Sequence, residues 1–285
     1  MKRLLSLLFV FTLFVAGCAP LATPTPAPTE SPAATEVAVT VPPTTAPEPR
    51  TLTVFAAASL KDAFTEIGKN FEGAHPGVTV ALNFAGSQTL RTQLEEGAAA
   101  DVFASANHTE MDNAVKAGLV QDGAARDFLT NKLLVILPAS NPANLTSLQD
   151  LTRSGVKVVL AADTVPAGKY ARQILDKMSQ DPSFGSDFGT KVLANVVSNE
   201  NDVKQVVAKV QLGEADAGIV YVSDAIAAPE LVTIEIPAEL NVLAQYPIAA
   251  LTQAPQPELA ADFVAYVLSS EGQDILVKWG FSAIQ

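Results

Sequence analysis

Residues 52–71, LTVFAAASLKDAFTEIGKNF, join a short apolar strand to an amphipathic helix through a run of small residues. Apolar residues recur at helical spacing at Leu60, Ala63, Phe64, Ile67 and Phe71, which predicts one buried helix face. Ser59-Leu60-Lys61-Asp62 fits a capping box, so we expect Ser59 to be the N-cap of this helix. The stretch therefore predicts a strand–turn–helix unit whose turn carries a serine.

The same alternation continues to the end of the chain. Further strands are expected at 78–84, 101–105, 133–137, 156–160, 192–197, 218–221 and 231–236, and helices after Ser87, after Thr109, after Pro166, after Asp202, and over 258–268 and 272–279. Such alternation is typical of α/β layers with largely parallel sheets. Residues 51–285 are many for one such sheet, so we expect two lobes.

Composition narrows the function classes. The 285 residues include 30 acidic and 18 basic ones, for a net charge of −12, and an acidic chain repels a phosphate backbone, so no nucleic acid is expected. A single cysteine excludes an internal disulfide framework and a cysteine zinc site. The sequence has only two histidines, which are too few for a histidine-rich metal centre. We expect no cofactor and no metal held directly by side chains.

The amino terminus has the pattern of a secretory signal. Lys2-Arg3 precede an apolar run over 4–15, which is shorter than the roughly 20 residues of a membrane-spanning helix, and Val15-Ala16-Gly17-Cys18 follow. The last four resemble a bacterial lipobox, which implies removal of residues 1–17 and lipidation of Cys18. The alternative is an ordinary signal peptide with a chance cysteine.

Residues 18–50 form the next segment. Nine prolines and seven threonines fall between Ala19 and Arg50, and no aromatic residue does. Such a stretch buries too little apolar surface to fold, and its prolines favour an extended spacer. We expect a disordered tether between a membrane and the folded body.

Four turns share one chemistry, because each is small or polar and each starts a helix. They are Ala58-Ser59, Gly86-Ser87, Pro166-Ala167-Gly168 and Asn201-Asp202-Val203. Ligands of open α/β sheets bind where strands end and helices begin, and helix N-termini attract anions. Taken singly, a capping serine is ordinary helix structure, and Tyr221 at a strand end fits a half-buried core residue.

Five blocks carry a family resemblance, in order, over nearly all of residues 51–285. They are 54–60 (VFAAASL), 84–90 (FAGSQTL), 100–106 (ADVFASA), 165–171 (VPAGKYA) and 213–225 (GEADAGIVYVSDA). This pattern resembles the solute-binding proteins of bacterial molybdate ABC transporters. The resemblance implies a two-lobed periplasmic binding protein fold (type II), with mixed or parallel sheets flanked by helices and a ligand cleft between the lobes.

The resemblance also implies the site. Ser59 and Ser87 would donate hydroxyl and backbone N–H groups to molybdate or tungstate, Ala167 and Val203 would donate backbone N–H groups, and Tyr221 would donate its hydroxyl. The family's second loop is often richer in serine, and Gln88 is a possible substitute donor here.

The family resemblance also implies that residues 51–132 plus 239–285 form one lobe and residues 133–238 form the other. The protein would be an extracytoplasmic monomer that is anchored through the lipid on Cys18. It would deliver its ligand to the membrane permease of an ABC transporter and would not be an enzyme.

Three alternatives stay open. The nearest is a receptor for another tetrahedral oxyanion such as sulfate. A surface serine hydrolase would need a base for Ser59 or Ser87, but His75 lies in a turn, His108 lies in a polar loop, and the Gly-x-Ser-x-Gly motif is absent from the sequence. A structural adhesin on a stalk would give the four turns no purpose.

Overall fold

The structure is a computed structural model, and it describes residues 49–284. Cys18 and almost all of the predicted tether lie outside the described residues. The first strand begins at Arg50, one residue before the predicted start of the folded body. Within 49–284, the helices are all too short or too polar to cross a membrane.

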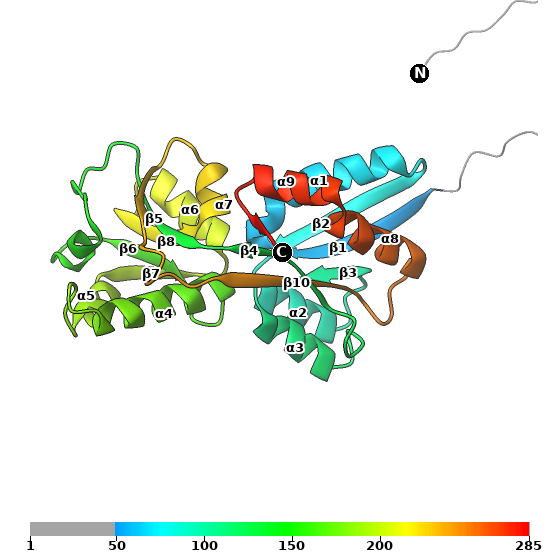
Figure 1. Cartoon of the computed structure of the whole chain (residues 1–285), viewed down its shortest axis with the longest axis horizontal. Coiled ribbons are helices and arrows are strands. Elements are labelled where there is room, and N and C mark those ends of the chain that lie inside the picture. The colour runs from blue at the N-terminus through cyan, green and yellow to red at the C-terminus, as the bar shows by residue number, and fades with distance from the viewer. Residues whose placement is uncertain (1–48, 285) are drawn as a thin grey trace, which may run out of the picture. The chain divides into compact units, whose positions relative to one another are not determined.

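The first sheet has six strands in the order β11-β4-β10-β3-β1-β2 (Figure 1). Neighbours β2, β1 and β3 run parallel, whereas β10, β4 and β11 pair antiparallel. The strands are β1 (Arg50–Ala57), β2 (Val78–Ala85), β3 (Val102–Ala104), β4 (Arg126–Asn131), β10 (Ala244–Ala250) and β11 (Ser282–Ala283).

The second sheet has five strands in the order β7-β6-β8-β5-β9. Strands β7, β6 and β8 are parallel, and β5 pairs antiparallel with both β8 and β9. The strands are β5 (Leu133–Leu137), β6 (Val158–Ala161), β7 (Val196–Glu200), β8 (Ala217–Tyr221) and β9 (Val232–Glu235).

Helices flank both sheets (Figure 1). Around the first sheet lie α1 (Lys61–Ala74), α2 (Ser87–Glu95), α3 (His108–Lys116), α8 (Pro257–Leu268) and α9 (Ser270–Lys278). Around the second lie α4 (Pro166–Gln180), α5 (Phe188–Ala194), α6 (Val203–Gln211) and α7 (Val222–Ile226). Short 3₁₀ turns occupy Ala58–Leu60 and Leu148–Thr152. The predicted α/β class, with two mixed sheets flanked by helices, is confirmed.

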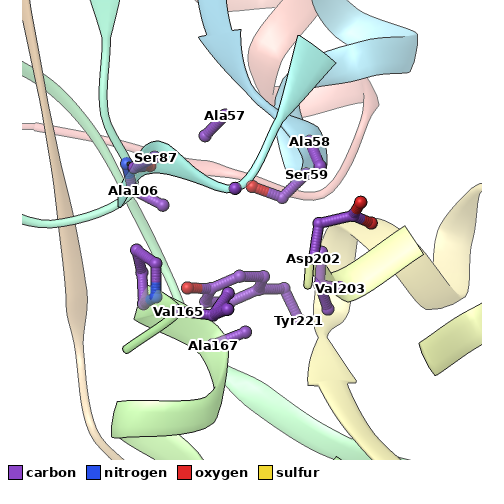
Figure 2. Close-up of a pocket in the computed structure, with 12 residues that line it drawn as sticks. Ala57, Ala58, Ser59, Ser87, Ala106, Val165, Ala167, Asp202, Val203 and Tyr221 are labelled. Carbon is purple, nitrogen blue, oxygen red and sulfur yellow. The ribbon is translucent and has the colours of Figure 1, made fainter. Parts of the chain in front are cut away.

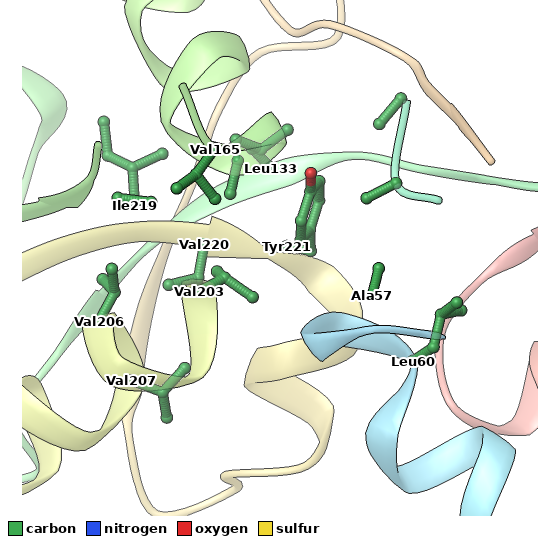
Figure 3. Packing of buried hydrophobic residues seen from close by; sticks show 14 of the residues in the cluster. Ala57, Leu60, Leu133, Val165, Val203, Val206, Val207, Ile219, Val220 and Tyr221 are labelled. Carbon is green, nitrogen blue, oxygen red and sulfur yellow. The ribbon is translucent and has the colours of Figure 1, made fainter. Parts of the chain in front are cut away.

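Apolar faces repeating at helical spacing account for the core. Val203, Val206, Val207 and Val210 form the buried stripe of α6, and Figure 3 shows the first three beside Val220 of β8. Strands β5 and β8 are buried along their whole length, as expected for central strands covered on both faces.

The chain crosses between the sheets twice, from β4 to β5 and from β9 to β10. Asn241 ties the two crossings together: its Oδ1 accepts from the Leu133 N–H (3.1 Å) and its Nδ2 donates to the Leu133 carbonyl (2.8 Å). The two lobes are therefore joined at one place by two hydrogen-bonded segments.

Several local predictions were wrong. Val192 lies in α5, and the strand expected over 192–197 is β7, which begins only at Val196. The helix predicted after Thr109 begins at His108, with Asn107 as its cap. Strands β4 and β10 were missed, because β4 mixes polar and apolar residues and β10 contains Pro247, which lies at a register shift in the ladder.

Candidate functional site

A cavity lies where the helices of both lobes begin (Figure 2). Its volume is about 10 Å³, far below the range of drug-sized ligand pockets, so it has room only for a small ligand. The lining residues are Ala57, Ala58, Ser59, Gly86, Ser87, Ala106, Val165, Pro166, Ala167, Asp202, Val203 and Tyr221.

All five residues expected to hold the ligand line this one cavity. Ser59 follows β1 and Ser87 is the first residue of α2. Ala167 and Val203 lie in the first turns of α4 and α6, and Tyr221 ends β8. Two of the five thus come from the first lobe, which is built on the first sheet, and three come from the second lobe, which is built on the second sheet.

Three helix N-termini meet at the cavity, those of α2, α4 and α6. The first N–H groups of a helix have no partner within the helix, and the helix dipole adds partial positive charge there. Asp202 also lines the cavity, but its carboxylate accepts from the backbone N–H (3.0 Å) and side-chain amide (2.7 Å) of Gln205. The cavity is therefore rich in N–H donors.

Ser87 is held with its hydroxyl proton free. Its Oγ accepts from the backbone N–H of Ala106 at 3.0 Å, and the side chain is almost fully buried. A backbone amide can only donate, so the Ser87 hydroxyl keeps its own proton for another acceptor.

The prediction that Ser59 is the N-cap of a helix was wrong. It lies in the 3₁₀ turn before α1, whose N-cap is Leu60, with no side-chain capping bond. Its Oγ lies 2.9 Å from the hydroxyl of Tyr246, and either oxygen can be the donor. The 3₁₀ turn places the Ser59 hydroxyl at the cavity. As an N-cap, the same hydroxyl would have bonded a backbone N–H of α1.

Tyr221 is a buried residue with an available donor. Among residues 49–284, no partner lies within hydrogen-bonding distance and angle of its hydroxyl, and the side chain is 1% exposed. Burial raises the pKa of Tyr221 well above its usual value, so the phenol keeps its proton. The half-buried position expected from the sequence is therefore corrected to full burial, because β8 is a central strand.

Two glycines permit close backbone approaches around the cavity. A Cβ on Gly168 would lie 2.0 Å from the Ala162 carbonyl oxygen, so α4 can start this close to β6 only with glycine there. A Cβ on Gly86 would lie 2.6 Å from the Asn201 carbonyl oxygen in the other lobe.

Gln88 was expected as a possible extra donor to the ligand. Its Nε2 instead donates to the Asn201 carbonyl at 3.0 Å. The side chain thus bonds the opposite lobe and does not line the cavity.

The lining residues, all within 49–284, include no lysine or arginine. Nearby cations are engaged elsewhere: Lys204 with Asp62 (2.7 Å) and Asp224 (3.2 Å), and Arg91 with Glu110 (2.7 Å). Burial works against the charge of Lys204, but the carboxylates of Asp224 and Asp62 outweigh it and raise its pKa. The partial positive charge at the cavity therefore comes from backbone N–H groups at the helix N-termini.

Neither histidine lies in the cavity. The Nδ1 of His75 is 2.8 Å from the Phe71 carbonyl, and the Nε2 of His108 is 3.0 Å from Asp127. Neither serine of the cavity therefore has an imidazole base beside it.

Sequence reasoning missed Ala106, Val165 and Tyr246. Tyr246 is 187 positions from Ser59 along the chain and lies in a strand that was not predicted. Only the tertiary structure brings it behind the site.

Comparison with known proteins agrees with this architecture. Residues 52–282 match the family model of bacterial extracellular solute-binding proteins. The chain belongs to this family.

This solute-binding protein is 44% identical over 234 residues to the molybdate-binding protein ModA of Mycobacterium tuberculosis, covering 82% of this chain and 85% of that relative. It is 32% identical over 238 residues to ModA of Escherichia coli, covering 81% and 88%. The structure of the periplasmic molybdate-binding protein of Azotobacter vinelandii superposes with a TM-score of 0.71 at 19% identity, over 82% of this chain and 100% of that one, which shows the shared fold. The resemblance found in the sequence is confirmed.

Proposed function

We propose that this solute-binding protein captures molybdate, and tungstate equally, in the cavity between its lobes. Ser59, Ser87, Ala167, Val203 and Tyr221 would be the donors. The observation that carries the proposal is the meeting of three helix N-termini and three hydroxyls at a small cavity whose lining has no cationic side chain. The relatives named as molybdate-binding proteins support the choice of ion.

Neutral donors suit a fully deprotonated dianion. Each hydrogen bond to a charged group contributes roughly 1.5–3 kcal/mol, so several together bind the ion without a counter-charge. Distant acidic side chains are screened and do not cancel local dipoles. Hydrogen phosphate carries an O–H that needs an acceptor, and the one carboxylate of the lining, that of Asp202, already accepts from Gln205. Sulfate has the charge of molybdate but is smaller, so cavity size would select between them.

We propose lobes of residues 51–132 plus 239–285 and 133–238, which close on the ion as a hinge. Contacts between the lobes already exist at Gln88–Asn201 and at Lys204–Asp62. The closed monomer would then deliver the ion to the permease of an ABC transporter.

We further propose that residues 1–17 are a signal peptide and that Cys18 carries a lipid. The lipid and the proline-rich tether of 18–50 would hold the protein at the outer face of a membrane. The protein would act by binding alone, since the cavity serines have no imidazole base beside them.

Calorimetric titration of the purified protein with molybdate, tungstate, sulfate and phosphate tests the function. We expect molybdate and tungstate to bind with similar affinity and sulfate at least about 100-fold more weakly, a difference of about 2.7 kcal/mol. If sulfate binds as tightly as molybdate, the protein is a general oxyanion receptor. If none of the four ions gives a heat of binding, the proposal is overturned.

A further inference from the structure

Tyr246 lies behind the cavity and contacts a predicted ligand residue from each lobe. Its hydroxyl is 2.9 Å from the Oγ of Ser59, and its ring meets the ring of Tyr221 edge-on, with 5.8 Å between centroids. The side chain is fully buried in β10, the strand by which the chain returns to the first lobe. No sequence motif singled it out.

The Ser59–Tyr246 contact has two possible directions with opposite consequences. A serine hydroxyl has one proton and two lone pairs. If Ser59 donates to Tyr246, its proton is used and its oxygen presents lone pairs to an anion. If Tyr246 donates, the Ser59 proton is free to bond the anion.

The other cavity serine shows which direction suits the site. Ser87 accepts from the Ala106 N–H, which can only donate, so its proton remains free. Both serines are buried at the same cavity, and each has one polar group behind it. Burial also raises the pKa of Tyr246, so its phenol retains the proton that it would donate.

We infer that Tyr246 is a positioning residue, which donates to Ser59 Oγ and turns the Ser59 hydroxyl toward the bound oxyanion. The inference rests on the proposed function. Tyr246 itself does not line the cavity, so its effect on binding passes through Ser59.

A double-mutant cycle on the full chain tests this, with molybdate affinity measured by calorimetry. Tyr246→Phe keeps the ring and should weaken binding by about 3- to 10-fold, the range for one neutral hydrogen bond. In a Ser59→Ala background the same change should weaken binding by less than about 2-fold, because its target is gone. Tyr266→Phe is the control: that hydroxyl bonds Glu271 on the surface, and affinity should not change.

Equal losses from Tyr246→Phe in both backgrounds would show a general packing role and overturn the inference, as would no loss in either. If the unsubstituted protein binds molybdate but the losses of affinity from Tyr246→Phe and Ser59→Ala are additive, the inference is overturned and the proposed function stands. Unsubstituted protein that binds no oxyanion overturns the proposed function and the inference with it.

A second measurement does not depend on the stability of the phenylalanine variant. 3-Fluorotyrosine placed at position 246 keeps the hydroxyl but makes it a stronger donor and a weaker acceptor. Molybdate affinity should rise if Tyr246 donates to Ser59. An affinity that falls or stays the same would overturn the inferred direction.

Discussion

The side-chain amide of Gln88 donates to the backbone carbonyl of Asn201, with Nε2 and O 3.0 Å apart. Gln88 lies in α2 beside the first sheet, and Asn201 precedes α6 beside the second. Gly86 lies at the same contact, where a Cβ would be 2.6 Å from the Asn201 oxygen. The lobes can approach this closely only because position 86 has no side chain.

Gly86→Ala should therefore hinder closure and weaken molybdate binding by about 10-fold or more, since overpacking typically costs 1–3 kcal/mol. The melting temperature of the ligand-free protein should change little if the lobes separate to relieve the clash. Gly73→Ala is the matched control, because nothing lies within 4 Å of a Cβ there. It should leave affinity unchanged, and a similar loss of affinity in both variants would contradict the explanation.

Ser87→Ala should weaken molybdate binding by about 10- to 150-fold, equivalent to roughly 1.5–3 kcal/mol for a hydrogen bond to a charged group. It also leaves the buried Ala106 N–H without its acceptor, so stability should fall by about 1–3 kcal/mol. Calorimetry and urea unfolding measure the two effects. Ser183→Ala, in a surface turn with Asp181, should change neither affinity nor stability by a comparable amount; unchanged affinity in Ser87→Ala would remove Ser87 from the site.

Lys204 joins the partly exposed carboxylate of Asp62 to the buried one of Asp224. Lys204→Met should lower the free energy of unfolding at pH 7 by about 3–5 kcal/mol, because Asp224 is left buried without its cation. Asp62→Asn removes only the partly exposed partner and should cost at most about 1 kcal/mol. Urea unfolding measures both variants. Equal losses of unfolding free energy in Lys204→Met and Asp62→Asn would be evidence against a buried Lys204–Asp224 pair.

The Lys204→Met defect should depend on pH. Burial raises the pKa of Asp224, and without Lys204 the carboxyl should take up a proton more readily still. A raised folded-state pKa means that stability is lost as the pH rises through that value, so the defect should be large at pH 7 and should shrink toward pH 4. Urea unfolding at both pH values checks this; a defect of constant size would contradict it.

Asp150 should show the opposite pH dependence. Backbone N–H groups of Thr146 and Ser147 lower its pKa to about 2, below the usual value of about 3.9 in an unfolded chain. Its ionised form therefore stabilises the fold above about pH 4, and that contribution is lost as the pH falls toward 2. Asp150→Asn should be less stable at pH 7, by about 1 kcal/mol for a weakened cap, and equal to the unsubstituted protein near pH 2. A difference that persists at pH 2 would exclude this origin.

Local patterns were enough to predict the strand–turn–helix units and the small residues at their turns. The periodicity of Leu60 to Phe71 and the valine stripe of α6 each mark one buried face, and Pro166 marks a helix start. These signals are local because helix spacing and capping depend on neighbours within a few residues. Val192 was misassigned because an apolar run fits a short helix as well as a strand.

The alternation of strands and helices and the four small or polar turns that start helices were determined by the sequence alone. The tertiary structure decided which turns share a cavity, that Gln88 bonds the opposite lobe, and that Tyr246 lies 2.9 Å from Ser59. The physical reason is that contacts between distant segments depend on how sheets stack and where the chain crosses between them, and no spacing within a single segment encodes that geometry.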